Sequence, residues 1–327
     1  MTRYDYSVFR RDICPPSDLA TLSFDFLISA YNESERVKIL WDNVSAGQRI
    51  WINHAEYGFG SSDLPPSDYV HAGAVGEGEL EFWASLFSSD LMPVGSGGAR
   101  VGIDITGLMR PHVIALPLAL TLNGYKSATI LYSDPNAYSS GSSTPFSIGP
   151  ILNVSPVNGF EGIHNTGVNQ DDLLIIGSGY DDQVIRAAAE SKRAADQVVL
   201  VGLPSLQPHM YQESLLRLHK ASESIKNYSK RNHLFSPAND PFVTAGVLSE
   251  YLGRKFTNEI DNVYLCPTGP KTQALGFSWY FLCEALQTAT SIIYPYAGSY
   301  SQETSKGLAR THIFELELES IDISVLA

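Results

Sequence analysis

Four short polar turns in this sequence carry residue types that can bind an anion. Each turn follows an apolar run, which predicts a buried strand, and precedes a stretch with helical periodicity. The turns are residues 29–33, 106–110, 178–182 and 268–271. Backbone N–H groups at the start of a helix, together with nearby hydroxyl and basic side chains, can bind phosphate and ribose oxygens. We therefore expect the four turns to line a ligand site.

The residues expected to bind the ligand are the small, polar and basic members of these turns. They are Ser29, Tyr31 and Asn32 in the first turn, Thr106, Gly107 and Arg110 in the second, Ser178, Gly179, Tyr180 and Asp181 in the third, and Thr268, Gly269 and Lys271 in the fourth. Arg110 and Lys271 would pair with anionic groups. Ser, Thr, Asn and Asp also cap helices, so capping alone is the alternative explanation. Capping does not explain why the tyrosine, the acid and the Thr-Gly-basic pattern recur.

Three further residues could provide acid–base chemistry. Asp104 ends the strand before the second turn, Glu33 lies in the first turn, and His112 lies at the predicted start of a helix. Each also has a purely structural interpretation. The sequence contains no G-x-S-x-G, H-E-x-x-H or Walker A motif, and its three cysteines lack metal-ligand spacing. Residues 177–182 contain G-x-G without the third glycine of a dinucleotide site. We therefore predict neither a metal nor a cofactor.

The four strand–turn–helix units form a repeat. The first matches the third at an offset of 149 residues (Ser29 to Ser178), and the second matches the fourth at an offset of 162 (Thr106 to Thr268). Alternating strands and helices predict an α/β fold with mostly parallel sheets. The repeat predicts two related Rossmann-like halves, a pseudo-two-fold internal duplication, with the ligand cleft between them.

The expected boundaries follow from composition. The first half covers residues 1–140, a Ser/Gly/Pro/Asn-rich linker or loop covers residues 141–170, and the second half covers residues 171–327. An insertion within residues 204–260 would explain why the two offsets differ. The strictly alternating residues 314–319 predict an edge strand with one exposed face.

The composition of the chain indicates what the protein does not bind and where it is located. The 327 residues carry a formal net charge of −13, which disfavours binding to a nucleic-acid backbone. No apolar run is long enough to cross a bilayer, and residues 1–12 lack the apolar core of a signal peptide. We therefore expect a cytoplasmic protein that makes no contact with a membrane.

The fourth unit resembles a known sensor family. Residues 264–276 read Tyr-Leu-Cys-Pro-Thr-Gly-Pro-Lys-Thr-Gln-Ala-Leu-Gly, which is similar to the second conserved motif of CARF-type domains, with Pro270 in place of its second glycine. These Rossmann-like domains sense cyclic oligonucleotides in bacterial antiviral defence. The whole chain also resembles proteins encoded near defence loci. The resemblance implies that two fused halves could bind a nucleotide as a pair of CARF domains does.

Three functions are compatible with these patterns. The leading hypothesis is a sensor or regulatory protein that binds a nucleotide or phosphorylated metabolite and passes the signal to a protein partner. The second is a hydrolase or transferase acting on such a ligand, with Asp104 or Glu33 as the acid or base. The third is a structural subunit of a defence complex.

Overall fold

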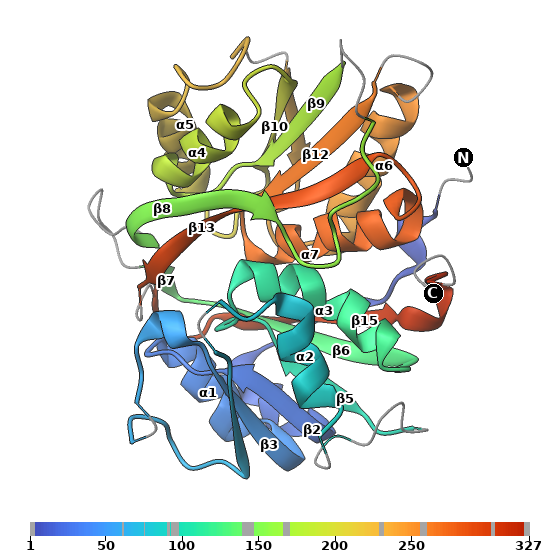
Figure 1. Cartoon of the computed structure of the whole chain (residues 1–327). Helices are drawn as coiled ribbons and strands as arrows, with labels where there is room; N and C mark the ends of the chain where they lie inside the picture. Colours follow the sequence, from blue (N-terminus) through green and yellow to red (C-terminus); the bar gives the residue numbers. More distant parts are fainter. Residues whose placement is uncertain are drawn as a thin grey trace. The chain divides into compact units, whose positions relative to one another are not determined.

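The chain forms two compact units, which the computed structural model describes over residues 4–60, 62–74, 76–89, 92, 98–138, 147–165, 171–228, 232–255, 260–301 and 305–323. Unit 1 contains Met1–Val8, Gly149–Gly298 and Ile321–Ala327. Unit 2 contains Phe9–Ile148 and Ser299–Ser320. Each unit is built on its own sheet (Figure 1).

The described part of unit 2 contains a sheet of seven strands in the order β1-β15-β6-β5-β2-β3-β4. Their bounds are β1 Arg11–Cys14, β2 Ser23–Ala30, β3 Ser45–Asn53, β4 Tyr69–Ala72, β5 Val101–Asp104, β6 Ser127–Asp134 and β15 Arg310–Glu317. The strands from β2 to β6 are parallel to their neighbours, whereas β15 is antiparallel to β6 and to β1. A separate pair, β7 (Ala137–Tyr138) and β14 (Ser305–Lys306), is antiparallel.

In the described residues of unit 2, three α-helices cover the sheet. They are α1 (Glu35–Asn43), α2 (Glu79–Phe87) and α3 (Arg110–Leu122). Helices α2 and α3 pack side by side, and α1 covers the opposite face (Figure 1). On the α1 face, Leu27 and Trp51 share a buried core with Val37, Leu40 and Trp41, and the two indole rings stack at 3.5 Å. Burial of this apolar stripe fixes the start of α1 at the carboxyl edge of the sheet.

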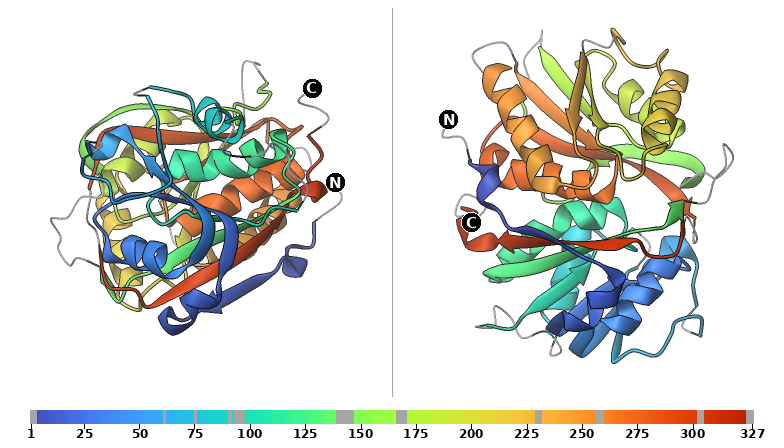
Figure 2. Two further views of the ribbon diagram at one scale, coloured as in Figure 1. Left: turned by 90° about the horizontal axis from the view of Figure 1, so that it is seen from below. Right: turned by 180° about the vertical axis from the view of Figure 1, so that it is seen from behind.

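Unit 1 has a similar sheet of six strands among its described residues, in the order β11-β10-β9-β12-β13-β8. Their bounds are β8 Ser147–Pro156, β9 Asp172–Gly177, β10 Asp196–Gly202, β11 His233–Ser236, β12 Asn262–Pro267 and β13 Thr290–Tyr300. The helices are α4 (Asp182–Ser191), α5 (Met210–Lys220), α6 (Pro241–Lys255) and α7 (Lys271–Tyr280), and α7 continues as a π-helical turn over Phe281–Ala285. Helix α4 packs beside α5, and α6 packs beside α7 (Figures 1 and 2).

The two sheets repeat one strand order. If strands are numbered within each repeat, both sheets read 3-2-1-4-5, as β4-β3-β2-β5-β6 and as β11-β10-β9-β12-β13. This arrangement confirms the predicted α/β fold with two Rossmann-like halves and mostly parallel sheets. Helix α5 lies between β10 and β11, whereas only the short 3₁₀ helix η3 (Ala55–Tyr57) is found among the described residues between β3 and β4. The insertion that accounts for the difference between the offsets of 149 and 162 residues therefore lies within residues 203–232.

Each sheet is completed by a strand that follows the other repeat in the chain. Strand β8 follows β6 of unit 2 but lies beside β13 in unit 1. Strand β15 follows β13 of unit 1 but pairs with β6 in unit 2. At the offset of 162 residues, 147–156 map onto 309–318, so β8 and β15 are themselves repeated elements. The two units thus exchange their sixth strands.

The structure corrects three expectations. Residues 147–156 form β8 rather than part of a loop, while residues 139–146 and 166–170 of the expected linker region lie outside the described residues. Residues 299–320, expected in the second half, belong to unit 2. Strand β15 alternates in burial as predicted but lies between β1 and β6, so it is not an edge strand. All three corrections have one cause. Strand pairing across the repeats joins segments that are far apart in the chain, whereas sequence patterns are local.

No helix in the described ranges has the length and apolar character needed to cross a membrane.

Candidate ligand site

The predicted turns lie at the point where each sheet reverses its strand order. This switch point falls between β2 and β5 in unit 2 and between β9 and β12 in unit 1. Crossover helices leave the two central strands toward opposite faces there, which opens the carboxyl edge of an α/β sheet to ligands. The turns at 29–33 and 106–110 follow β2 and β5, and those at 178–182 and 268–271 follow β9 and β12. The topology therefore brings the four turns together as two pairs, one in each unit.

The paired turns touch through their backbones. A Cβ atom on Gly107 would lie 1.8 Å from the carbonyl oxygen of Ala30. In unit 1, a Cβ atom on Gly179 would lie 2.2 Å from the carbonyl oxygen of Thr268. Glycine is required at both positions because any side chain would occupy the neighbouring turn.

A buried chain of hydrogen bonds runs along the carboxyl edge of unit 2. The Ser29 hydroxyl donates to Asp104 Oδ2 (2.8 Å), and the Thr106 N–H donates to Asp104 Oδ1 (2.9 Å). The Ser133 N–H in turn donates to Thr106 Oγ1 (2.9 Å). These four residues are at most 1% exposed. Three residues predicted from the sequence therefore form one network, which links β2, β5 and β6.

Arg36 continues this chain. Its Nη1 donates to the Ser133 carbonyl (2.6 Å), and its guanidinium carbon lies 5.8 Å and 5.5 Å from the ring centres of Tyr132 and Tyr138. The residue is 7% exposed. Among the described residues, no carboxylate lies within ion-pair distance of Arg36, and its Nε has no hydrogen-bond partner. Against the effect of burial, Tyr138, Tyr132 and the Asp134 carboxylate raise the pKa of Arg36. Unit 2 therefore holds a buried cation at the carboxyl edge that Asp134 stabilises from beyond ion-pair distance.

Asp134 ends β6 on the same face of the strand as Tyr132. Its Oδ2 accepts from His312 Nε2 (2.8 Å) and from Arg310 Nε (3.0 Å), and its carboxylate is 2% exposed. Its Oδ1 has no partner in the described protein. Two side chains of β15, Arg310 and His312, thus contact the end of β6.

Sequence reasoning missed Arg36, although the chain contains a signal for it. Arg36 lies in the first turn of α1, where the helix dipole disfavours a cation. An arginine at that position, directly after a predicted ligand turn, indicates an anionic partner. Asp134, Arg310 and His312 gave no comparable signal, because Arg310 and His312 reach the edge only through the strand exchange.

Unit 1 lacks the equivalent polar chain. At the repeat offsets, Cys266 replaces Asp104, Ile185 replaces Arg36 and Pro295 replaces Ser133. Cys266 and Ile185 are fully buried, and burial raises the pKa of the Cys266 thiol. The carboxyl edges of the two units are therefore chemically different.

The predicted residues of unit 1 contact neighbouring strands, turns and helices of the same unit. The Ser178 hydroxyl pairs with that of Ser214 (3.2 Å), and Thr268 Oγ1 donates to the Gly177 carbonyl (2.7 Å). The Asp181 carboxylate accepts from the N–H groups of Gln183 and Val184, so it caps α4. Tyr180 lies just before α4, Gly269 packs against Gln273, and Lys271 begins α7.

The other predicted residues of unit 2 surround the start of α1. Tyr31 is a core residue that packs edge-on against Trp51, and Asn32 Oδ1 accepts from the Ser34 N–H (3.0 Å). Glu33 pairs with Lys38 and accepts from the Tyr31 hydroxyl (2.9 Å). The Lys38 ammonium and the Tyr31 hydroxyl lower the pKa of Glu33, so its carboxylate is ionised at neutral pH. Arg110 is half-buried and begins α3.

His112 lies away from this network, in an aromatic cluster. Its ring is 4.5 Å from His54 and 4.7 Å from Phe82, and its Nδ1 has no hydrogen-bond partner. Burial, assisted by nearby His71, lowers the pKa of His112 to about 3. The imidazole is therefore neutral near pH 7 and cannot donate a second proton as a general acid there.

Asp104 is expected to stabilise the edge of unit 2 strongly. Asp104→Ala leaves the Ser29 hydroxyl and the Thr106 N–H without this acceptor, so we expect unit 2 to lose about 3 kcal/mol in urea denaturation. Asp42→Ala, at an exposed position of α1, should change stability by less than about 0.5 kcal/mol. Equal effects of the two changes would contradict this role.

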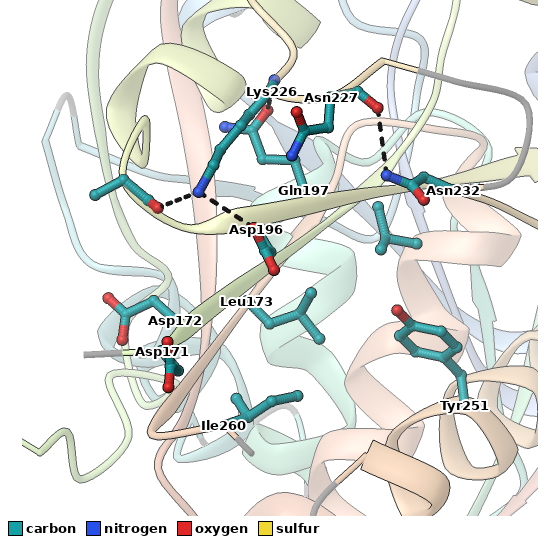
Figure 3. Close-up of a pocket in the computed structure, with 12 residues that line it drawn as sticks. Asp171, Asp172, Leu173, Asp196, Gln197, Lys226, Asn227, Asn232, Tyr251 and Ile260 are labelled. Atoms are coloured by element: carbon teal, nitrogen blue, oxygen red, sulfur yellow. Dashed lines mark hydrogen bonds and ion pairs between the residues drawn. The ribbon is translucent and has the colours of Figure 1, made fainter. Parts of the chain in front are cut away.

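Two pockets in the described part of the chain lie away from the predicted turns. One of about 260 Å³ is found at the amino edge of the unit 1 sheet, where Asp172 and Asp196 begin their strands (Figure 3). Its basic residue, Lys226, already pairs with Asp196 Oδ1 (3.2 Å) and with the Ala194 carbonyl (2.8 Å). Another, of about 550 Å³, lies at the amino edge of unit 2 beside Tyr125. Neither pocket is lined by a predicted ligand residue.

Within the described ranges, no group of three or more His, Cys, Asp or Glu side chains is arranged to hold a metal ion.

No protein-family model and no curated protein matches this chain.

Proposed function

We propose that the protein binds a small phosphorylated or nucleotide-like ligand at the carboxyl edge of the unit 2 sheet, and that it acts as a sensor or regulatory protein. The single observation that carries the proposal is the buried guanidinium of Arg36. A buried cation is costly unless an anion accompanies it. Arg36 lies beside the switch point, where α/β sheets bind ligands.

The surrounding groups fit an anionic ligand. The start of α1 directs free N–H groups toward the same edge. The guanidinium lies over the rings of both Tyr132 and Tyr138, so little of its freedom is lost when an oxyanion binds. The buried chain from Ser29 to Ser133 fixes the carbonyl that Arg36 contacts.

The contacts of the acid–base candidates favour a binding protein over an enzyme. The Asp104 carboxylate accepts from two protein donors, Glu33 is ion-paired with Lys38, and His112 is buried and neutral. None of these three side chains is presented as a free proton donor or acceptor. A sensor needs only binding that a partner protein can detect.

Replacing Arg36 with leucine should weaken binding strongly without unfolding the protein. In titrations with nucleotides and sugar phosphates, Arg36→Leu is expected to weaken the affinity roughly 100-fold, because charge-assisted hydrogen bonds are lost. Without ligand, Arg36→Leu loses the hydrogen bond to the Ser133 carbonyl together with the cost of the buried charge, so it should melt no lower than Arg49→Leu. Each mixture is analysed afterwards by chromatography, and conversion of the ligand would favour the enzyme.

Arg49 is a matched control for Arg36. It also contacts an aromatic ring, that of Trp41, and donates to the backbone carbonyls of Trp41 and Val44. Arg49→Leu should lower stability and leave the affinity unchanged. If no phosphorylated ligand binds the parent protein, or if Arg36→Leu binds as tightly as the parent, the proposed function is wrong.

A further inference from the structure

Three buried polar atoms around Tyr138 have no partner in the described protein. They are Arg36 Nε, Asp134 Oδ1 and Ser305 Oγ. Arg36 lies over the Tyr138 ring, and Ser305 faces Tyr138 across the β7–β14 pair. The Asp134 carboxylate is close enough to both side chains to help raise the pKa of Tyr138 and of Arg36. Each unsatisfied buried group costs about 1–3 kcal/mol, and native proteins rarely leave such groups unpaired. Three of them in one cluster indicate a shared external partner.

The chemistry of these atoms restricts that partner. Arg36 Nε can only donate, Asp134 Oδ1 as a carboxylate can only accept, and the Ser305 hydroxyl can do either. A partner must therefore accept a hydrogen bond from a cation and donate one to a carboxylate. The charges of Arg36, Arg310 and Asp134 sum to +1, which favours a partner with negative charge.

We propose, building on the proposed function, that this cluster binds a terminal phosphate group that carries a proton. The unprotonated phosphate oxygens accept from Arg36, and the P–OH group donates to Asp134 Oδ1. Inorganic phosphate and phosphomonoesters can supply both. Sulfate, carboxylates and phosphodiesters are ionised acceptors without such a proton, so they leave Asp134 Oδ1 facing an anion. Asp134 is thus the residue that selects among oxyanions, and Arg36 is the residue that attracts them.

The test compares inorganic phosphate with inorganic sulfate by calorimetric titration of the whole protein at pH 7. We expect the parent protein to bind phosphate at least 10-fold more tightly than sulfate. Asp134→Asn replaces the acceptor with an amide that can donate, so the preference should disappear. Ribose 5-phosphate and dimethyl phosphate then separate the ligand sources: tighter binding of the monoester than of free phosphate identifies a phosphomonoester ligand, and dimethyl phosphate should bind no better than sulfate.

The outcomes separate the two proposals. Equal affinity of the parent protein for phosphate and sulfate, or an unchanged preference in Asp134→Asn, overturns the inference about Asp134 while Arg36-dependent ligand binding still stands. Absence of all anion binding overturns both. The phosphate-to-sulfate ratio of the parent protein needs no variant, so the inference is tested even if Asp134→Asn does not fold.

Discussion

The folded protein is expected to lose stability steeply as the pH falls from 6.5 toward 3, because of His112. In the folded state the pKa of this histidine is lowered from 6.5 to about 3 by burial, with His71 as a second cause. Between pH 6.5 and about pH 3, His112 is therefore protonated in the unfolded chain but neutral in the folded protein. The stability is fully present above pH 6.5, and up to about 5 kcal/mol of it is lost by pH 3.

The measurement is the free energy of unfolding in urea at several pH values. His112→Leu fills the same aromatic cluster and removes the titrating group, so its stability should fall much less between pH 6.5 and pH 4. His219→Gln, at an exposed position of α5, is the matched control and should follow the parent. Parallel curves for the parent and His112→Leu would show that His112 is not responsible.

A second large effect is expected from Gly107→Ala. The new methyl group would lie 1.8 Å from the Ala30 carbonyl oxygen, which is backbone and cannot rotate away. The turns after β2 and β5 must then separate, which breaks the contacts from Ser29 to Thr106. We expect unit 2 to lose about 3 kcal/mol or more, and ligand affinity to fall with it.

Gly60→Ala provides the comparison in the same unit. Its Cβ atom would meet the Asp63 side chain at 3.4 Å and the Ser62 hydroxyl at 3.9 Å, both ordinary contacts, so stability should change little. Gly179→Ala repeats the clash in unit 1, at 2.2 Å from the Thr268 carbonyl. It should destabilise unit 1 without weakening the binding that we propose for unit 2. Normal melting of Gly107→Ala would mean that the two turns do not abut.

The strand–helix units and their repeat could be predicted because they are local patterns. Apolar runs of strand length alternate with amphipathic stretches, which is the pattern of parallel strands joined by helices. The exchanged strand β8 could not be predicted in the same way. Its sequence contains Gly149 and Pro150, which are typical of loops, and Gly149 has a φ of 91°. Its place in a sheet depends on β13, more than a hundred residues later in the chain.

For the candidate site as well, only the residues placed by local patterns could be predicted from the sequence. Ser29 and Asp104 lie at the carboxyl ends of the central strands and Thr106 follows β5, so the position of the switch point was enough to place them near one another. Arg36 lies one helical turn beyond the predicted turn and reaches back over the edge. Arg310 and His312 come from β15, which no local pattern connects with β6. Side chains that arrive from distant segments are the part that spacing along the chain does not reveal.

The exchange of β8 and β15 determines the order in which the two sheets can be completed during synthesis on the ribosome. Strand β13 emerges after β8 has already been made, so unit 1 can complete its sheet at once. Asp134 of β6 must wait for Arg310 of β15, 176 residues later. At roughly 5–20 residues per second this delay is about 9–35 s. During that time β1 has no strand to join and the edge of β6 stays unpaired, which exposes the nascent chain to wrong strand pairing. A chain that terminates before residue 310 would keep that edge permanently open.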